Sequence, residues 1–398
     1  MRKQLKHKLV YTGLDIIDRK WPKSLKGTNA GLLVHPASIN RNLKHSIEIC
    51  LKSRNFKVTT LFGPQHGIHG ETQDNMIEWK GFIDKKTGLP VYSLYGDYRQ
   101  PTPLMLSDID VLIIDLQDIG SRYYTFIWTM DMCFHSCSHM NKSVVILDRP
   151  NPIGGHITEG NVLKSEYASF VGLKPLPVRH GMTIGEIANY LRNEFYPGLD
   201  LYIIPIQNWK RNIWFNETGL IWVLPSPNMP ALDTALVYPG MCLLEGTNIS
   251  EGRGTTRPFE IFGAPFIDPE NLVGRLKELH LPGVVFRPMY FEPTFQKYAG
   301  KLCGGAQIHI MNREKFKPFK TGIAILRIIH DLYPDKFSWK LPPYEYEYEK
   351  MPIDIIAGTD NLRIKIEKGE TIEKIEEWYS DECRDFNRKY RKKYLIYK

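Results

Sequence analysis

The 398-residue sequence has few cysteines and no long apolar segment. No stretch approaches the roughly 18 apolar residues of a membrane-spanning helix, so none is predicted. The basic N-terminus has only scattered apolar residues and lacks the core of a signal peptide, so we expect a cytoplasmic protein. The six cysteines are irregularly spaced and too sparse for a disulfide scaffold, which predicts reduced, mostly packed thiols.

Nucleotide-binding and serine-hydrolase motifs are also missing. No G-x-G-x-x-G follows the first predicted strand, no G-x-x-x-x-G-K-[ST] occurs, and there is no G-x-S-x-G elbow. The net charge of +8 is mild for this length, and no basic block is followed by aromatic repeats. We therefore expect no cofactor and no nucleic-acid partner.

Zinc-ligand residue types do cluster in one segment, CFHSCSH. The preceding residues predict a helix, on which Cys133 and Cys137 share one face. His135 and His139 would then point about 200° away from that face, so the four groups cannot converge on one ion. A packed helix without a metal is the prediction.

The order of strands and helices predicts an α/β fold. Short apolar runs alternate with helical patterns in the first half, as parallel strands covered by helices do. The predicted strands are 31–34, 57–62, 91–94, 110–115 and 143–147, and the predicted helices are 44–53 and 124–140. The later part mixes strands with helices, at 283–286, 306–310, 321–332 and from 371 onward. We expect a Rossmann-like parallel-sheet domain over 1–238 and a smaller C-terminal α/β or α+β domain over 239–398.

Polar residues follow the predicted parallel strands. In open α/β sheets the ligand lies beyond the carboxyl ends of the strands, which makes these residues candidates for a site. Alternatively, they are helix caps and turn formers. The residues are His35, Gln65, His66, Asp115, Gln117, Asp118, Arg122, Asp148, Arg149 and Asn151.

A second polar concentration lies in EGTNISEGRGTTRPFE, which includes Glu245, Asn248, Glu251 and Arg253 among glycines and threonines. Charged groups on a tightly turning backbone suit a polar ligand, although a solvated surface loop is the alternative. By contrast, the alternating tyrosines and glutamates of 344–349 predict an exposed extended segment.

These residue types together describe a sugar site. Carboxylates and amides bind hydroxyl groups, aromatic rings stack on a pyranose, and arginine binds a carboxylate. Glycosidases commonly need two carboxyl groups flanking the scissile bond. The candidates for this role are Asp115, Asp118, Glu245, Glu251 and Glu71.

Several long motifs resemble those of one known family, the exo-β-N-acetylmuramidases of the NamZ type. Among them are GLLVHPASIN, LFGPQHGIHGETQ, DVLIIDLQDIGSRYYTFIWTM, VVILDRPNPIGG, RHGMTIGEIA, WVLPSPNMP and LLEGTNISEGRGTTRPFE. The resemblance covers nearly the whole chain. It implies a Rossmann-like N-terminal domain, a smaller C-terminal domain, an active site between them, and release of N-acetylmuramic acid from the non-reducing end of peptidoglycan fragments.

The chain departs from the family pattern in one loop. Gln65 stands where the family has the glutamate of P-E-H-G, and Asn75 and Met76 stand where a later G-E pair falls. If either missing glutamate is the acid or base in active members, three alternatives remain. The protein uses Glu71 or Asp74, acts on a different amino-sugar glycoside, or binds an amino sugar without cleaving it.

Our working hypothesis is a glycoside hydrolase that acts on a small saccharide or muropeptide. Glu245 or Glu251 would be paired with Asp118 or Glu71 across the anomeric carbon. Arg122, Arg253 and Asn228 would bind the lactyl carboxylate and ring substituents, and Gln65 the N-acetyl group. Further substrate contacts are expected from His66, Asp115, Gln117, Tyr123, Asn151, His180 and Asn248. His180 precedes a predicted helix start in which Thr183 and Glu186 form a capping box. The sequence predicts no oligomeric state.

Overall fold

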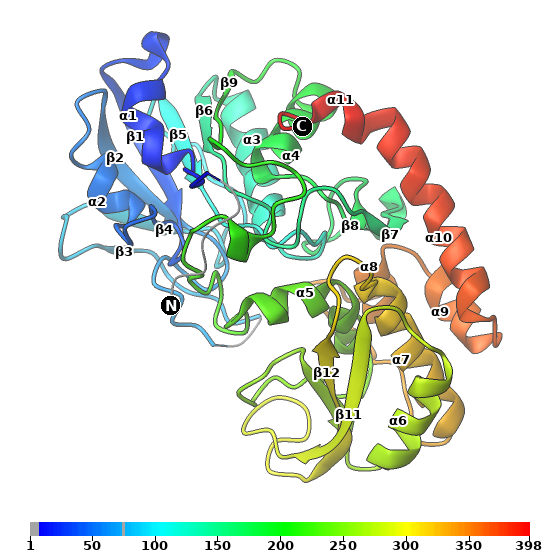
Figure 1. Ribbon diagram of the computed structural model, residues 1–398. Helices are drawn as coiled ribbons and strands as arrows, with labels where there is room; N and C mark the ends of the chain where they lie inside the picture. Colours follow the sequence, from blue (N-terminus) through cyan, green and yellow to red (C-terminus); the bar gives the residue numbers. More distant parts are fainter. Residues whose placement is uncertain (1–7, 74–75) are drawn as a thin grey trace.

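The structure is a computed structural model that describes residues 8–73 and 76–398. Asp74 and Asn75, named above, lie outside the described residues. The N-terminal domain is built on a seven-stranded sheet, and a smaller domain with its own sheet follows it (Figure 1). The predicted Rossmann-like architecture with a smaller second domain is therefore confirmed.

The large sheet has the order β3-β4-β2-β1-β5-β6-β9. Its neighbouring strands are parallel except for β3 beside β4. Chain order reverses between β1 and β5, as in a doubly wound fold. The strands are β1 (Thr28–Val34), β2 (Phe56–Gly63), β3 (Phe82–Ile83), β4 (Pro90–Ser93), β5 (Val111–Asp115), β6 (Ser143–Leu147) and β9 (Leu201–Ile204).

Alternating side chains of the central strands bury two faces of this sheet. On β5, Leu112 and Ile114 pack in the same cluster as α3 (Phe126–His139) and α4 (Ile184–Phe195). Val111 and Ile113 instead pack with residues of α1 (Ile17–Lys20) and α2 (Ser46–Cys50). Because both faces are covered, the strands read as continuous aliphatic runs, which is why the sequence predicts them well.

Two local predictions are confirmed in the helices. Thr183 and Glu186 form the predicted capping box at the start of α4. On α3, Cys133 and Cys137 are buried, whereas His135 and His139 are exposed on the other side. All six cysteines are buried free thiols, as expected. In the described part of the chain, none of the helices is long and apolar enough to cross a membrane.

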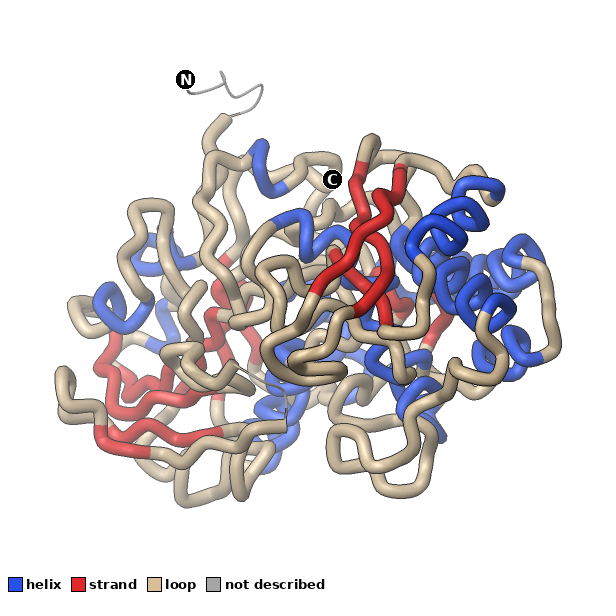
Figure 2. Tube along the Cα trace, turned by 90° about the horizontal axis from the view of Figure 1, so that it is seen from below, coloured by secondary structure: helices blue, strands red, loops and turns tan. Residues whose placement is uncertain are grey.

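The C-terminal domain packs helices on an antiparallel sheet of order β10-β12-β11. Figure 2 shows how much of the chain between the strands is loop. A two-stranded sheet of β7 (Glu159–Val162) and β8 (Pro177–Arg179) lies beside α10. The remaining elements are α5 (Leu232–Met241), β10 (Ile261–Ala264), α6 (Pro269–Glu278), β11 (Val284–Phe291), β12 (Cys303–Ile310), α7 (Pro318–Leu332), α8 (Pro352–Ala357), α9 (Asn361–Glu367) and α10 (Ile372–Phe386).

Helices α5 and α7 approach each other at a pair of glycines. A Cβ atom on Gly240 would overlap the backbone carbonyl oxygen of Pro318, and one on Gly322 would overlap the carbonyl of Gly240. Only glycine allows two backbones this close. The contact sets the position of α5, which leads directly into the polar segment after residue 241.

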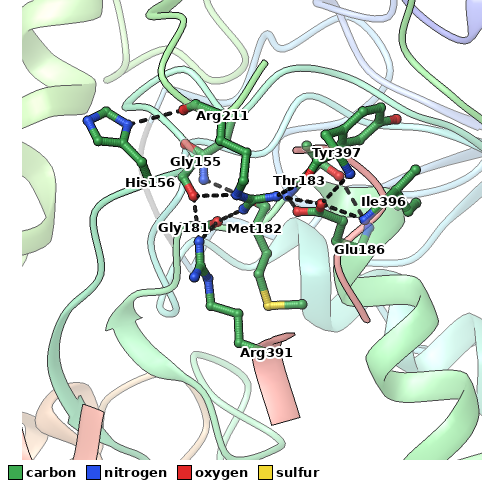
Figure 3. A network of polar contacts seen from close by, with 12 residues as sticks. Gly155, His156, Gly181, Met182, Thr183, Glu186, Arg211, Arg391, Ile396 and Tyr397 are labelled. Carbon is green, nitrogen blue, oxygen red and sulfur yellow. Dashed lines mark hydrogen bonds and ion pairs between the residues drawn. The ribbon is translucent and has the colours of Figure 1, made fainter. Parts of the chain in front are cut away.

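The chain then returns to the N-terminal domain through α10 and α11 (Lys392–Tyr394), the red helices of Figure 1. Near its end the Tyr397 hydroxyl donates to Asp148 at 2.6 Å, and the Ile396 N–H donates to Glu186 Oε1 at 2.8 Å. Arg211 pairs with the same carboxylate of Glu186 at 2.6 Å. Figure 3 shows the part of this network around Glu186 and Arg211, in which Arg391 also donates to backbone carbonyl groups.

Candidate active site

A pocket lies between the two domains, and its empty space of about 500 Å³ includes open solvent at the mouth. Its N-terminal wall comes from the loop after β2, the start of α3 and the segment before α5. Its C-terminal wall comes from α5, the segment after it and a turn near residue 345. The lining residues are Gln65, His66, Tyr123, Tyr124, Thr125, Phe126, Val171, Ser226, Asn228, Met229, Tyr238, Glu245, Arg253, Phe259, Tyr344 and Glu345.

Amide and imidazole groups mark the N-terminal wall. The Thr125 hydroxyl donates to Gln65 Oε1 at 2.8 Å, which fixes the buried amide of Gln65. His66 has a positive φ of 70°, and its Nδ1 lies 2.7 Å from the carbonyl oxygen of Thr72. Since a carbonyl oxygen only accepts, Nδ1 carries a proton. Gln65 itself cannot serve as an acid, because an amide does not release a proton near neutral pH.

Asn228 joins two loops at the pocket. Its Nδ2 donates to the carbonyl oxygen of Gln73 at 2.8 Å, and Gln73 Nε2 donates back to its Oδ1 at 3.3 Å. These reciprocal bonds fix the segment before α5 against the loop that follows β2. The orientation of the Asn228 amide is therefore set before any ligand binds.

Glu245 is the buried anion of the C-terminal wall. Its Oε1 accepts from Arg253 Nη2 at 2.8 Å, and its Oε2 accepts from the Tyr344 hydroxyl at 2.8 Å. Burial is the largest single effect and would raise the pKa of Glu245, but the charge and hydrogen bond of Arg253, the hydrogen bond from Tyr344 and the charge of Lys297 together hold this pKa below its ordinary value. Glu245 is thus a carboxylate at neutral pH.

Glu251 lies behind Arg253 and is not part of the pocket lining. Lys297 Nζ lies 2.9 Å from its Oε2, and Arg253 Nε lies 3.3 Å from its Oε1. Both of its oxygens face cations, and the side chain is buried. This geometry makes Glu251 a support for Arg253 and does not place it at the pocket.

Glu345 is a second carboxyl group on the pocket wall, and the sequence did not point to it. We expected an exposed segment at 344–349, which is wrong for Tyr344 and Glu345, because both are buried. The Tyr95 hydroxyl donates to Glu345 Oε2 at 2.9 Å. Burial raises the pKa of Glu345 to about 7. Only the folded chain brings Glu345 to Tyr95, so no local spacing could have revealed it.

Comparison with known proteins fits this geometry. Family models of exo-beta-N-acetylmuramidase NamZ match residues 30–233, as its N-terminal part, and 236–397, as its C-terminal part. The chain belongs to the NamZ family. It is 47% identical over 388 residues to the peptidoglycan beta-N-acetylmuramidase NamZ of Bacillus subtilis (strain 168), covering 98% of this chain and 91% of that protein.

Solved structures of two DUF1343 family proteins from Bacteroides fragilis have the same fold as this NamZ-family chain. One superposes with a TM-score of 0.87 at 34% identity, and the other with a TM-score of 0.77 at 28% identity. Each match covers 98% of this chain and 99% of the other protein. The two-domain arrangement is thus shared along the full length.

Asp115 and Gln117 do not contact the pocket of this NamZ-family protein, contrary to our expectation of substrate contacts. Arg149 binds both oxygens of Asp115, at 2.5 and 2.7 Å. The Gln117 side chain donates to the carbonyl oxygens of Asp118 and Pro150. These buried side chains are held by contacts within the protein at the carboxyl ends of the strands.

Asp118 and His180 form a buried contact of their own. Asp118 Oδ2 lies 3.2 Å from His180 Nε2 and accepts from the Gly120 N–H at 2.7 Å. His180 Nδ1 lies 3.2 Å from the Met182 nitrogen that donates to it. Neither residue lines the pocket. The structure therefore places Asp118 in a contact with His180 and not at the pocket that Glu245 lines.

Three other expected site residues lie away from the pocket lining. Asn151 donates to the carbonyl oxygen of Met182 at 2.9 Å and accepts from the Ile153 N–H. Asn248 bridges the backbone at Lys336 and Ser338, and Glu71 is exposed. Asparagine serves turns and backbone bridges as readily as ligands, which the sequence could not distinguish.

Arg122 is buried and does not line the pocket, so the structure does not bring it to the position predicted for binding a substrate carboxylate. Its Nη1 donates to the carbonyl oxygens of Asn161 and Leu176, and its Nη2 donates to those of Ile356 and Ala357. Ile356 and Ala357 are the last two residues of α8. Burial lowers the pKa of Arg122 to about 10, so the group remains a cation near neutral pH. It joins the two domains.

We expect Arg122→Lys to reduce the free energy of unfolding by about 2 kcal/mol, because a lysine cannot satisfy all the buried carbonyl groups. The Michaelis constant of any substrate should stay unchanged at a temperature where the variant is folded. Urea unfolding and steady-state kinetics measure the two quantities. A rise in the Michaelis constant without loss of stability would show instead that Arg122 contributes to substrate binding.

Proposed function

We propose that this protein is a glycoside hydrolase that releases N-acetylmuramic acid from the non-reducing end of peptidoglycan fragments. The observation that carries the proposal is the ionised Glu245 in a pocket with amides and aromatic rings. The supporting likeness is the identity of 47%, over nearly the full length, to a peptidoglycan beta-N-acetylmuramidase. A pocket set between two domains suits one terminal sugar better than the interior of a long chain.

The lining residues divide the recognition of this sugar between them. We assign the N-acetyl group to the amides of Gln65 and Asn228, which present donors and acceptors in fixed orientations. Arg253 is a cation on the wall and would bind the lactyl carboxylate. The rings of Tyr123 and Tyr238 both line the pocket and contact each other edge to face, with their centres 5.8 Å apart, and together they would offer an apolar surface to the pyranose.

Glu245 would act on the anomeric carbon. Its negative charge would stabilise the positive charge that develops on the sugar ring in an oxocarbenium-like transition state. Whether it attacks the carbon or activates a water depends on its distance from the acid, about 5 Å in retaining enzymes and about 6.5–9.5 Å in inverting ones. His66 lies on the same wall as the amides and would contact a hydroxyl group.

The alternative is an amino-sugar-binding protein that does not cleave its ligand. Gln65 favours it, because an amide stands in the pocket where a carboxyl group would supply acid chemistry. A glycosidase for a different amino sugar is the third candidate. All three candidate functions would use the same pocket. They differ in the product, because the binding protein releases none and the other glycosidase releases a different amino sugar.

Incubation with matched glycosides decides among the three. We expect release of 4-nitrophenol from the β-N-acetylmuramide to exceed release from the β-N-acetylglucosaminide about 10²-fold, because only the first offers a carboxylate to Arg253. Saccharide binding in calorimetry without any release would support the binding protein. Faster release from the glucosaminide would support the different glycosidase.

Two further expectations belong to this proposal. The domain boundary predicted after residue 238 falls within α5, and it stays a proposal. We also propose action in the cytoplasm, where six buried free thiols would stay reduced.

A further inference from the structure

Glu345 lies at the border of two hollows. One is the pocket described above, and the other is an open groove on the outer side, lined among others by Arg99, Phe170 and Tyr346. Glu345 lines both. In an exo-acting glycosidase the bond to be broken lies between the terminal sugar and the group that leaves. A residue shared by the inner pocket and the outer groove is therefore placed where that bond would cross.

A strained turn presents this carboxyl group. The N–H of Tyr344 donates to the carbonyl of Glu347 at 2.9 Å, and the reverse bond measures 3.0 Å. Glu345 and Tyr346 are the two residues between them, with φ angles of 45° and 67°. Positive φ at both central positions is the conformation for which glycine and asparagine are preferred. Two non-glycine residues persist there only where their surroundings fix them, as at functional sites.

The surroundings of this turn come from the N-terminal domain. The Arg99 guanidinium carbon lies 4.2 Å from the ring centre of Tyr346 and 4.3 Å from that of Tyr95. Arg99 is itself held by Glu78 at 2.8 Å. Tyr95 in turn donates to Oε2 of Glu345. One oxygen of the carboxyl group is thereby oriented, which leaves the other to carry a proton.

The charges around Glu345 favour a carboxyl group that is protonated near neutral pH. All effects together raise its pKa to about 7; burial is the largest of them, and the hydrogen bond from Tyr95 acts in the opposite direction. The negative charge of Glu245 raises it further, and Arg253 and Arg99 lower it. The pKa of Glu245 is shifted the opposite way. Two carboxyl groups with pKa values pushed apart are the arrangement that acid and anion roles require.

We propose that Glu345 is the proton donor of the glycosidase reaction, an inference that rests on the proposed function. Its carboxyl proton passes to the glycosidic oxygen as the bond between that oxygen and the anomeric carbon breaks. Glu345 is left as a carboxylate, and the leaving sugar departs as an alcohol through the outer groove. Water supplies the hydroxyl group that the anomeric carbon gains, and the proton from that water restores the protonated state of the site.

The test compares two substrates that differ in their need for a proton. Glu345→Gln should reduce hydrolysis of a muramic-acid disaccharide, whose leaving group is a sugar, about 10²–10³-fold. The 2,4-dinitrophenyl β-N-acetylmuramide should lose less than about tenfold, because its leaving group departs without protonation. Glu349→Gln is the matched control: Glu349 is exposed in the same segment, and both rates should be unchanged.

The outcomes separate this proposal from the one it rests on. Wild-type protein that cleaves neither muramide refutes the proposed function. Active wild-type protein with a Glu345→Gln variant that still cleaves the disaccharide normally overturns the role of Glu345. An equal loss on both substrates also overturns it, because a general loss indicates a structural role.

A second variant keeps the proposal testable if Glu345→Gln does not fold. Because deprotonated Glu345 cannot donate a proton, kcat/KM for the disaccharide should fall as the pH rises through about 7, which gives the pH profile an alkaline limb. The hydrogen bond from Tyr95 favours the charged form of Glu345, so Tyr95→Phe should raise this pKa and move the limb to higher pH. A limb that stays in place in the folded variant overturns the proposal.

Discussion

Glu245→Gln is expected to lower kcat about 10³-fold or more on every β-N-acetylmuramide, whatever its leaving group. The variant keeps the shape of the side chain and its bond to Tyr344 but removes the negative charge that we propose to face the anomeric carbon. That charge is needed even when the leaving group departs unaided. Saccharide binding measured by calorimetry should weaken far less than kcat.

Glu251→Gln provides the matched comparison, because Glu251 contacts the same Arg253 but does not line the pocket. We expect loss of stability, since Lys297 and Arg253 each lose a charged partner, with kcat lowered much less than in Glu245→Gln. Equal losses of kcat in the two variants would show that Glu245 acts only by supporting Arg253. They would contradict the assigned chemistry.

Gly240→Ala should remove at least about 3 kcal/mol from the free energy of unfolding, and Gly240→Val should give no folded protein at 37 °C. The added carbon meets the backbone of Pro318 in α7, which cannot rotate away as a side chain does. To make room, α5 would have to shift and carry Tyr238 and Glu245 with it. Thermal and urea unfolding of purified protein measure the loss.

Gly274→Ala is the control for this prediction. Gly274 lies exposed in the helix α6, and nothing stands within 4 Å of a Cβ atom added there. Alanine is favoured over glycine in helices, so the variant should gain about 0.5–1 kcal/mol. Destabilisation of both variants to the same extent would mean that the close contact at Gly240 is not the cause.

The sheet could be predicted because its strands are buried on both faces. The strands Val111–Asp115 and Ser143–Leu147 are aliphatic except for one polar residue at an end of each, and they were predicted almost to the residue. The helix predicted over 44–53 is shorter, from Ser46 to Cys50. Helix α5 was not predicted, because it contains Pro239 and has apolar residues around its whole circumference. Packing against α7, and not local preference, makes it a helix.

The site was only partly predictable. Gln65, His66, Tyr123, Asn228, Glu245 and Arg253 were named from the sequence and do line the pocket, while their roles stay predictions. The sequence could not separate them from Asp115, Asp118 and Asn151, because buried polar networks use the same residue types as ligand sites. Nor could it find Glu345, whose partner Tyr95 lies far away along the chain.

The return of α10 and α11 to the N-terminal domain determines how a ligand can enter. If α5 alone joined the two domains, a saccharide could be admitted by a hinge rotation that swings them apart. Here the same rotation would have to break the bonds of Tyr397 to Asp148 and of Ile396 to Glu186. We therefore expect a saccharide to enter and leave through motion of the loops at the mouth, while these contacts between the C-terminal tail and the N-terminal domain stay formed.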